Sequence, residues 1–438
     1  MCILSREKEI EMARIVLGML GLGTVGGGVV RLLSHQKNLT LKMVAVRDLN
    51  KPRQLPAKCS LTSKAEEVIK DPEIEIIVEV MGGEEPATSL IKQALKNRKH
   101  VVTANKEVLA KHGPELFALA KEMGVTIFFE AAVAGGVPLI STIHKGLEAN
   151  ELSSVIGILN GTTNYILSSM DEQGTPFKQA LEKAQELGFA EQDASYDIEG
   201  HDVAYKLSIV SALAFGCFIE PKRILREGIQ TIGQEDIKLA KEFGYKIKLI
   251  GSVSTTGTNG NSESLDARVH PMLVPMTHPL ANVTGSNNGI LLQGKAVDEI
   301  AMVGPGAGQM PTASAVVGDI INLSSALQLP DFASYFHPDV AGHWANVAEP
   351  GDWTCPYFVR IIVKDTPGVI GQIGTIFGSN EISIQSLLQR GAKNNQATLV
   401  VITHECQNRR MTKALEDLKA CDFTDEIASC IRIFRGHL

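Results

Sequence analysis

The sequence is poor in aromatic residues, in positive charge and in paired cysteines. Aromatic side chains make up 5% of its 438 residues, and 42 Lys and Arg stand against 49 Asp and Glu, a formal net charge of -7. Binding to nucleic acid needs a basic face or stacking rings, and the chain has neither in bulk. Its seven cysteines include no Cys-x-x-Cys pair, which indicates reduced thiols. These absences predict a cytoplasmic protein that binds no nucleic acid.

Long apolar runs are absent as well. No run reaches the ~20 apolar residues that span a bilayer, so we expect no membrane segment. The uncharged stretch 15–30 contains six glycines, and the charges before it are of both signs, unlike those of a secretory signal. With 44% hydrophobic and 21% charged residues the composition is that of a folded protein, and the length predicts about three domains at roughly 150 residues each.

The first third of the chain alternates apolar and amphipathic segments, the pattern of a parallel sheet wrapped by helices. We expect strands at 14–20, 41–46, 74–80, 100–103 and 125–130, and helices at 24–34, 86–97 and 114–123. Longer helices follow at 176–187 and 200–215, and a polar turn cluster at 255–264 between apolar segments predicts a hairpin tip. After an aperiodic stretch at 330–356, six segments predict a β-α-β-β-α-β tail.

A glycine-rich turn follows the first expected strand and opens the first expected helix. Gly21, Gly23 and Gly26 have the spacing GxGxxG, with Thr24 and Val25 between them. In this context the glycines permit a tight turn, and the N–H groups at the helix N-terminus can bind a pyrophosphate. The motif predicts a dinucleotide site at these five residues. The alternative is a turn that serves only helix–sheet packing.

Arg47 and Asp48 stand at the end of the second expected strand. A carboxylate about 20 residues beyond the glycines often binds the ribose of NAD, and Asp48 lies 22 residues after Gly26. However, Arg47 precedes it and two further basic residues follow, Lys51 and Arg53. Guanidinium groups suit the 2′-phosphate of NADP, so the cluster favours NADP while NAD stays possible. The alternative is a solvated basic turn.

Two later strand ends carry charged residues. Lys106 follows the strand expected at 100–103, a position that faces the ligand crevice in open α/β sheets. The alternative is a lysine whose stem covers the surface. Glu130 begins a glycine-containing turn that ends at Pro138, and the carbonyls of such a turn suit a hard cation. A turn between two domains is the simpler interpretation of this segment.

The densest group of ionisable residues leads into the helix expected at 200–215. Asp202 and Lys206 are four residues apart and share a helix face, and Glu191 and Asp197 lie in the loop before them. The helix then becomes apolar nearly all round, which predicts burial. Buried charges are tolerated chiefly when they are paired and used, so the pair predicts a reactive site. The alternative is an exposed ion pair.

Five motifs, in this order along the chain, resemble those of homoserine dehydrogenases. They are the GxGxxG turn, Thr-Ala-Asn-Lys106, Leu159-Asn-Gly-Thr-Thr-Asn164, the acidic run from Gly188 to Lys206, and Gly304-Pro-Gly-Ala-Gly308 with the Pro-Thr-Ala-Ser-Ala-Val-Val that begins at Pro311. The tail, with Val363-Lys-Asp-Thr-Pro-Gly-Val369, resembles an ACT domain, a module that binds amino acids in biosynthetic enzymes. The chain departs from the family at Ala194, where proline is usual, and we expect a looser loop there.

The resemblance implies an NAD(P)-dependent interconversion of L-homoserine and L-aspartate 4-semialdehyde in threonine and methionine biosynthesis. It assigns the acid–base role to Lys206, the orientation of substrate or lysine to Asp202, and a place near cofactor and substrate to Lys106. Glu191 would hold the substrate amino group. The resemblance adds two substrate-site residues and one cofactor contact, namely Gly188, Asp197 and Gly306.

The resemblance also implies an ion, an effector and an oligomer. Glu130 with the carbonyls of Val133, Gly135 and Val137 would hold a monovalent cation, and this arrangement suits sodium better than magnesium. The ACT-like tail would bind an amino acid, with L-threonine favoured as a pathway end product. The same resemblance implies a homodimer or homotetramer.

The fold class that follows is α/β, with a Rossmann-type parallel sheet, an α+β domain for substrate binding and dimerisation, and a ferredoxin-like ACT module of βαββαβ topology. The expected domains are 1–137 for the dinucleotide, 138–310 for substrate and oligomerisation, 311–330 as a returning helix, 331–356 as a linker and 357–438 as the regulatory module.

Two other functions compete with this interpretation. One is a dinucleotide sensor that reports amino-acid levels through its tail without catalysis, and the other is a different amino-acid dehydrogenase on the same nucleotide fold. The Asp202–Lys206 pair argues against a sensor, which has no use for such a pair at a ligand site. Substrate profiling separates the two enzymes.

Overall fold

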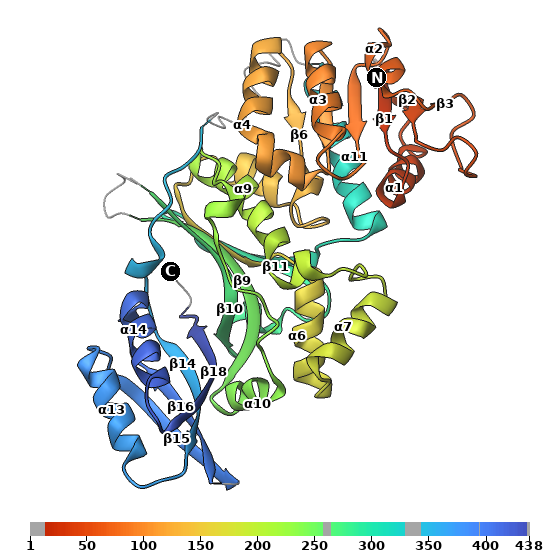
Figure 1. The fold of residues 1–438 in the computed structure, drawn as a ribbon. Coiled ribbons are helices and arrows are strands. Elements are labelled where there is room, and N and C mark those ends of the chain that lie inside the picture. Colours follow the sequence, from red (N-terminus) through yellow and green to blue (C-terminus); the bar gives the residue numbers. More distant parts are fainter. Residues whose placement is uncertain (1–13, 257–263, 329–342, 394, 436–438) are drawn as a thin grey trace, which may run out of the picture. The chain divides into compact units, whose positions relative to one another are not determined.

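The computed structural model describes residues 14–256, 264–328, 343–393 and 395–435, which belong to two compact units (Figure 1). Unit 1 is Met1–His144 with Gly308–Gly342, and unit 2 is Lys145–Ala307 with His343–Leu438. No helix among the described residues is both long enough and apolar enough to cross a membrane.

Unit 1 is built on a parallel sheet with strand order β3-β2-β1-β4-β5-β6. The strands are β1 (Ile15–Leu20), β2 (Leu39–Ala45), β3 (Ser60–Thr62), β4 (Ile76–Glu79), β5 (His100–Thr103) and β6 (Ile127–Phe128). The strand order reverses between β1 and β4, as it does at the ligand crevice of a Rossmann-type sheet. The α/β class predicted from the alternating pattern is therefore confirmed.

Helices cover the sheet of unit 1 on both faces. They are α1 (Thr24–Leu33), α2 (Ala65–Lys70), α3 (Ala87–Lys96), α4 (Lys106–Met123), α5 (Leu139–Ser141) and α11 (Gln309–Ala326), with the short turns η1 (Glu130–Ala132) and η2 (Thr142–Gly146). The late helix α11 packs closely on α1, since a Cβ on Gly28 would lie 2.7 Å from that of Ala313. This contact brings a segment from the far end of the sequence into the core of unit 1.

Two elements of unit 1 differ from the sequence prediction. The helix expected at 114–123 begins at Lys106, because the side chain of Asn105 accepts the backbone N–H of Val108 at 3.2 Å and caps the helix there. Pro114 then lies inside the helix. The strand expected at 125–130 shortens to β6, because the backbone N–H of Glu130 is donated to Asp319 at 2.8 Å and not to a neighbouring strand.

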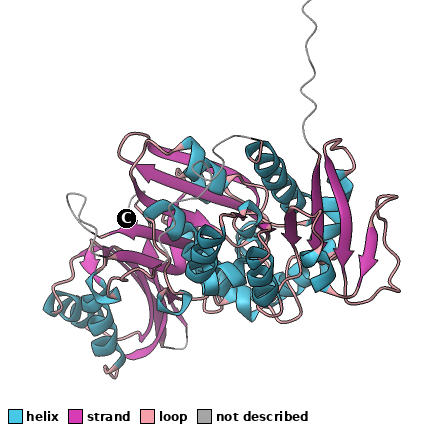
Figure 2. Cartoon of the chain, turned by 90° about the horizontal axis from the view of Figure 1, so that it is seen from above, coloured by secondary structure: helices cyan, strands magenta, loops and turns pink. Residues whose placement is uncertain are grey.

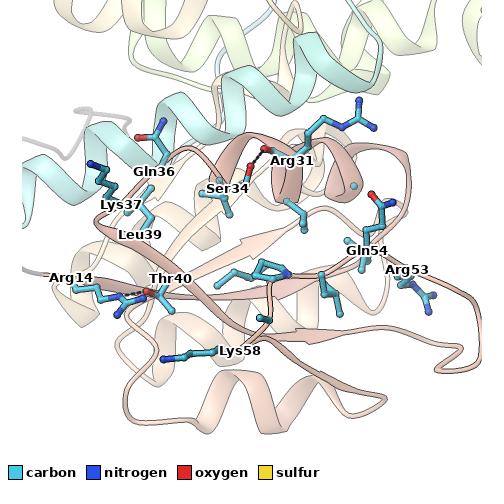
Figure 3. Close-up of a pocket in the computed structure, with 18 of the residues that line it drawn as sticks. Arg14, Arg31, Ser34, Gln36, Lys37, Leu39, Thr40, Arg53, Gln54 and Lys58 are labelled. Atoms are coloured by element: carbon cyan, nitrogen blue, oxygen red, sulfur yellow. Dashed lines mark hydrogen bonds between the residues drawn. The ribbon is translucent and has the colours of Figure 1, made fainter.

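A cavity of about 840 Å³ in unit 1 lies along α1 and β2 (Figure 3). The chain between β2 and β3 contains no helix, whereas a right-handed crossover usually places one beside α1. The loop packs Leu55 against the core instead, and this leaves the hollow. The labelled lining residues are Arg14, Arg31, Ser34, Gln36, Lys37, Leu39, Thr40, Arg53, Gln54 and Lys58.

Unit 2 is built on one long sheet with strand order β12-β11-β7-β9-β10-β18-β14-β16-β15, and β8 also pairs with β10. The strands are β7 (Leu152–Ile158), β8 (Leu225–Arg226), β9 (Tyr245–Thr255), β10 (Leu265–Pro275), β11 (Asn287–Gly294), β12 (Asp298–Pro305), β14 (Tyr357–Lys364), β15 (Ile384–Lys393), β16 (Gln396–Thr403) and β18 (Thr424–Ile433). Thr255 of β9 pairs with Leu265 of β10, which confirms the predicted hairpin. Residues 257–263 of its tip lie outside the described residues.

The helices of unit 2 fall into two groups along the chain. Those of the middle region are α6 (Gly161–Gln173), α7 (Phe177–Glu186), α8 (Ser195–Ile198), α9 (His201–Phe215) and α10 (Gln234–Glu242), with η3 (Pro221–Arg223) and η4 (Pro279–Asn282). Those of the tail are η5 (Pro350–Asp352), α13 (Val369–Ser379) and α14 (Asn408–Lys419). Helices α6 and α9 both pack on β9 of the long sheet.

The tail has the predicted β-α-β-β-α-β order, β14-α13-β15-β16-α14-β18, with its helices beside the sheet (Figures 1 and 2). It shares the sheet of the middle region, because β18 pairs in parallel with β10 at Met272↔Arg432 and Leu273↔Ile433. The last strand of the tail therefore lies directly beside the middle domain.

The segment expected as a linker at 331–356 is firmly bound where the structure describes it, from residue 343 onward. Ala345 donates its backbone N–H to Phe218 O at 2.7 Å, and the two short strands β13 (Thr354–Cys355) and β17 (Cys406–Gln407) pair with each other. The indole of Trp353 is 3.8 Å from the guanidinium carbon of Arg268. The described part is thus packed connecting chain, because its backbone groups and its tryptophan find partners on unit 2.

Candidate active site

The glycine turn and Arg47 line one pocket of about 560 Å³ in unit 1. Gly21 has φ 96°, and a Cβ there would lie 2.8 Å from the carbonyl oxygen of Val80. A Cβ on Gly26 would lie 2.8 Å from the carbonyl oxygen of Gly21. Both positions therefore require glycine for the tightness of the turn.

The first turn of α1 faces open space at this pocket. Gly23 is the N-cap, no side chain caps the helix, and a Cβ on Gly23 would meet nothing within 4 Å. Thr24 and Val25 follow as the first helical residues. Uncapped N–H groups at the positive end of a helix dipole suit the pyrophosphate of a dinucleotide. The residues present therefore fit that cofactor.

Arg47, Asp48, Lys51 and Arg53 all line the same pocket. Arg53 serves the loop itself, because its guanidinium donates to Asp48 O at 2.6 Å and to Lys51 O at 3.0 Å. The carboxylate of Asp48 accepts the backbone N–H of Asn50 at 2.9 Å. Within the described residues Arg47 and Lys51 make no ion pair, so these two cations remain available to an anionic ligand.

Lys106 is the first residue of α4, directly after the capping residue Asn105. A buried network fixes the backbone just before it. Thr103 donates its hydroxyl to Glu79 at 2.6 Å and accepts the backbone N–H of Asn105 at 3.0 Å. Burial raises the pKa of the Glu79 carboxyl above its ordinary value. Sequence reasoning missed Glu79, although a carboxylate that ends an apolar strand was a visible signal.

Glu130 is buried, and both of its carboxylate oxygens accept backbone N–H groups. Ile140 and Ser141 donate to them, each at 2.8 Å, so Glu130 ties its own turn to α5. Val133, Gly135 and Val137 lie on the turn that connects these elements. The described residues contain no group of three or more His, Cys, Asp or Glu side chains that could hold a metal.

Asp202 and Lys206 form a buried ion pair on α9 in unit 2, as predicted. Lys206 Nζ lies 2.7 Å from Asp202 Oδ2 and 2.6 Å from the carbonyl oxygen of Leu159. Lys206 is 8% exposed and Asp202 is 1% exposed, which excludes a solvated surface pair. The N-cap of helix α9 is Gly200, which has φ 82°. A Cβ on Gly200 would lie 2.9 Å from the side chain of Val269 on β10. The sheet thus fixes the start of the helix that carries the pair.

Asn160 brings Asp197 into the same cluster. Its Nδ2 donates to Asp197 Oδ1 at 2.7 Å and to Asp202 Oδ2 at 2.9 Å. Asn160 belongs to the motif Leu159–Asn164, but no role was predicted for it from the sequence. Its position before the first residue of a helix was the available signal.

Glu191 and Gly188 lie on the loop after α7, and both are exposed. The carbonyl of Glu191 accepts the side chain of Gln185 at 3.1 Å. Among the described residues no hydrogen bond joins Glu191 to the Asp202–Lys206 pair. Ala194, where the family has proline, is buried, and the carboxylate of Asp193 holds the backbone N–H of Ser195 at 3.0 Å.

Gly306 lies in unit 2, against the amide of Asn288. A Cβ at this position would come within 2.1 Å of the Asn288 side chain. Asn288 in turn donates to the carbonyl of Leu159 at 3.4 Å, the same carbonyl that accepts from Lys206. Packing on Asn288 therefore already accounts for a glycine here.

Comparisons with known proteins agree with this arrangement of parts. Residues 138–321 match the family described as "Homoserine dehydrogenase", and residues 21–130 match its NAD-binding domain. Residues 357–423 match the ACT domain.

Whole-chain relatives lead to the same family. The homoserine dehydrogenase of Synechocystis is 41% identical, and the match covers 96% of this chain and 99% of that protein. A crystal structure of a homoserine dehydrogenase from Thiobacillus denitrificans has a TM-score of 0.89 at 38% identity, with 97% and 99% of the two chains covered. A hyperthermophilic archaeal homoserine dehydrogenase mutant in complex with NADPH has a TM-score of 0.62 at 27% identity, covering 73% of this chain and 99% of that one. The chain belongs to the homoserine dehydrogenase family and carries an ACT domain.

Proposed function

We propose residue roles for the reaction of this family, the interconversion of L-homoserine and L-aspartate 4-semialdehyde. Lys206 exchanges the proton of the substrate oxygen, and Asp202 holds and orients the lysine. The observation that carries the proposal is the burial of this pair, with the ammonium 2.7 Å from the carboxylate. Removing two charges from water has a desolvation cost, so a buried pair of this kind is typical of a functional site. Activity with L-homoserine and each of NAD and NADP, followed by nicotinamide absorbance, tests it.

When bound, the nicotinamide dinucleotide supplies the hydride for reduction and accepts it in oxidation. In the reductive direction the substrate carbonyl oxygen gains negative charge, and the Lys206 ammonium gives it a proton to form the hydroxyl. Asp202 and the carbonyl of Leu159 hold the lysine nitrogen in place throughout. In the oxidative direction the neutral lysine takes the hydroxyl proton back.

The remaining substrate roles follow the family pattern. Glu191 on its exposed loop binds the substrate amino group, with Gly188 and Asp197 completing the site. Lys106, at the start of α4, contacts cofactor and substrate, and Gly306 contacts the cofactor. The exposure of Glu191 supports this role, since the carboxylate is accessible to an incoming ammonium group.

NADP is the proposed cofactor, with NAD as the weaker one. Arg47 and Lys51 are the cations that line the dinucleotide pocket without a carboxylate partner among the described residues. A 2′-phosphate gains charge-assisted hydrogen bonds from such groups. The NADPH complex of the archaeal relative supports the same preference.

A monovalent cation, sodium by preference, is proposed at Glu130 with the carbonyls of Val133, Gly135 and Val137. The support is the buried carboxylate, whose orientation is fixed by two backbone N–H groups of α5. The ion would steady the turn that ends the dinucleotide domain.

The ACT domain is proposed to bind L-threonine and inhibit the enzyme. A pocket of about 440 Å³ lies at its first loop, Val363–Ile370, and is also lined by Gln389 and Leu399. The side chain of Gln389 donates to Asp365 at 3.1 Å. Deleting the domain is a poor test, because Arg360 and Ser429 both bind Asp236, which is fully buried in the middle region.

Point variants test the effector site more cleanly. Asp365→Ala should weaken inhibition by threonine and leave activity without effector unchanged. The matched control is Asp425→Ala, which breaks a similar surface bond to Gln396 outside the pocket. Equal inhibition of Asp365→Ala and the unaltered enzyme would place the effector elsewhere.

Assembly and location complete the proposal. The edge strand β12 exposes 59% of Val303, and an unpaired edge with an apolar side chain suits pairing with a second copy. We therefore propose a homodimer, or a homotetramer of such dimers. All six cysteines of the described residues are free thiols, which supports a cytoplasmic location.

A further inference from the structure

Asn160 is the N-cap of α6 and is only 4% exposed. Its Oδ1 accepts the backbone N–H of Thr163 at 2.8 Å and the hydroxyl of the same residue at 2.9 Å. The amide oxygen therefore caps the N-terminus of α6 in the usual way. Serine, threonine and aspartate cap helices about equally well, so the cap alone does not call for asparagine.

The other half of the amide binds two carboxylates. Nδ2 lies within 2.9 Å of both Asp197 Oδ1 and Asp202 Oδ2, and an amide NH₂ group has one hydrogen for each. The reverse placement of the amide would set its oxygen against two carboxylates and its nitrogen against an N–H donor. The orientation of the side chain is therefore fixed by its partners.

The three residues come from three different elements. Asn160 starts α6, Asp197 lies on α8 and Asp202 lies on α9. Asp202 Oδ2 accepts from Asn160 on one side and from Lys206 on the other. One amide nitrogen thus joins the starts of α6 and α9 at the oxygen that holds the lysine.

We propose that Asn160 is a positioning residue of the reaction, acting on Lys206 through Asp202. It fixes the rotation of the Asp202 carboxylate, so that Oδ2 keeps the lysine nitrogen in one place. It also gives a hydrogen-bond donor to each of two neighbouring carboxylates that would otherwise repel each other. This inference rests on the roles proposed above for Lys206 and Asp202.

The test compares Asn160→Ser and Asn160→Asp in the full-length enzyme. Both variants keep an oxygen for the helix cap and lose the two amide N–H donors that reach Asp197 and Asp202. Aspartate also adds a third carboxylate of nearly the same size as the amide. We expect Asn160→Ser to lower kcat with L-homoserine about 10- to 100-fold while the KM for the dinucleotide stays within about twofold, because a hydrogen bond to a charged group is lost. Asn160→Asp should fall further.

Asn164, one turn later on α6, provides the matched control. It is 1% exposed, and its amide donates to the backbone carbonyls of Val283 and Asn287, each at 3.1 Å, with no carboxylate among these partners. Asn164→Ser should lower Tm at least as much as Asn160→Ser while leaving kcat per folded enzyme close to its original value. The primary deuterium isotope effect, measured with homoserine labelled at the carbinol carbon, should rise for both Asn160 variants and not for Asn164→Ser.

Unchanged kcat and isotope effect in both Asn160 variants would overturn the proposal, and so would an equal loss of kcat in Asn164→Ser. Lys206→Ala separates this failure from failure of the proposed roles. If Lys206→Ala is inactive while the Asn160 variants turn over normally, only the positioning role is wrong. If Lys206→Ala turns over normally, the role of the lysine itself is wrong.

Discussion

Replacement of Lys206 by methionine separates the contribution of the buried ion pair to stability from its contribution to catalysis. The variant keeps an unbranched side chain of similar length but removes the ammonium group. Asp202 is then left as a 1% exposed carboxylate that keeps the hydrogen bond from Asn160. Removing one partner of a buried pair typically costs about 3–5 kcal/mol. For a large domain this corresponds to a fall in Tm of roughly 10 °C.

The expected loss of activity differs from the loss of stability in its size and in its response to a second substitution. Loss of a positioned proton donor lowers the rate by about 10²–10⁴-fold, so we expect that drop in kcat for Lys206→Met and for Lys206→Ala. Cofactor affinity, measured by quenching or enhancement of NADPH fluorescence, should stay close to its original value, because Lys206 is not among the residues that line the dinucleotide pocket. The double variant Lys206→Met/Asp202→Asn should recover most of the lost Tm, because no buried charge is left alone, and should recover no activity.

The reasoning fails on either of two results. A single variant with undiminished kcat would show that the lysine does not handle the proton. A double variant that is no more stable than Lys206→Met would show that the buried carboxylate is not what destabilises the single variant. Thermal unfolding and steady-state kinetics on the same preparations give both answers.

Three further perturbations have defined outcomes. Arg47→Ala should lower the NADP/NAD ratio of kcat/KM by about 10- to 100-fold. The control is Arg31→Ala, because Arg31 lines the neighbouring cavity and not the dinucleotide pocket, and an unchanged ratio would assign Arg47 to solvated surface. Burial lowers the pKa of Lys248 from 10.5 to about 8, so between these values this lysine is more protonated in the unfolded chain, and its contribution to the free energy of unfolding should rise with pH. Urea unfolding of Lys248→Met should lack this rise of about 3 kcal/mol, and a rise equal to that of the unaltered chain would contradict the assignment. Glu130→Gln should abolish any difference in activity between sodium, potassium and a large organic cation, and equal activity of the unaltered enzyme in all three would remove the cation site.

The fold was largely predictable because its elements follow local periodicity. The strand at 100–103 has the bounds that apolar patterning suggested, and the tail has the predicted order of elements. One error arose where a distant residue decides the local structure. The short β6 results from Asp319, which is close to Glu130 in space and far from it in sequence. No local pattern contains that information.

The candidate site shows the same division. The Asp202–Lys206 pair was predictable, because both residues lie on one helix at a spacing of four. Asn160 was not, because its partners lie 37 and 42 residues away and only the fold brings them together. The pairing of β18 with β10 was equally hidden, since a strand pattern carries no record of its neighbour.

The pairing of β10 with β18 has a consequence for the order of synthesis. Strand β10 leaves the ribosome well before β18, so one stretch of its edge has no partner while the ACT domain is still being translated. An unpaired strand edge in a nascent chain invites pairing with another chain. Chains truncated before β18 should therefore aggregate or depend on chaperones. In the full-length chain, the middle region and the ACT domain would become stable in the same late step of synthesis.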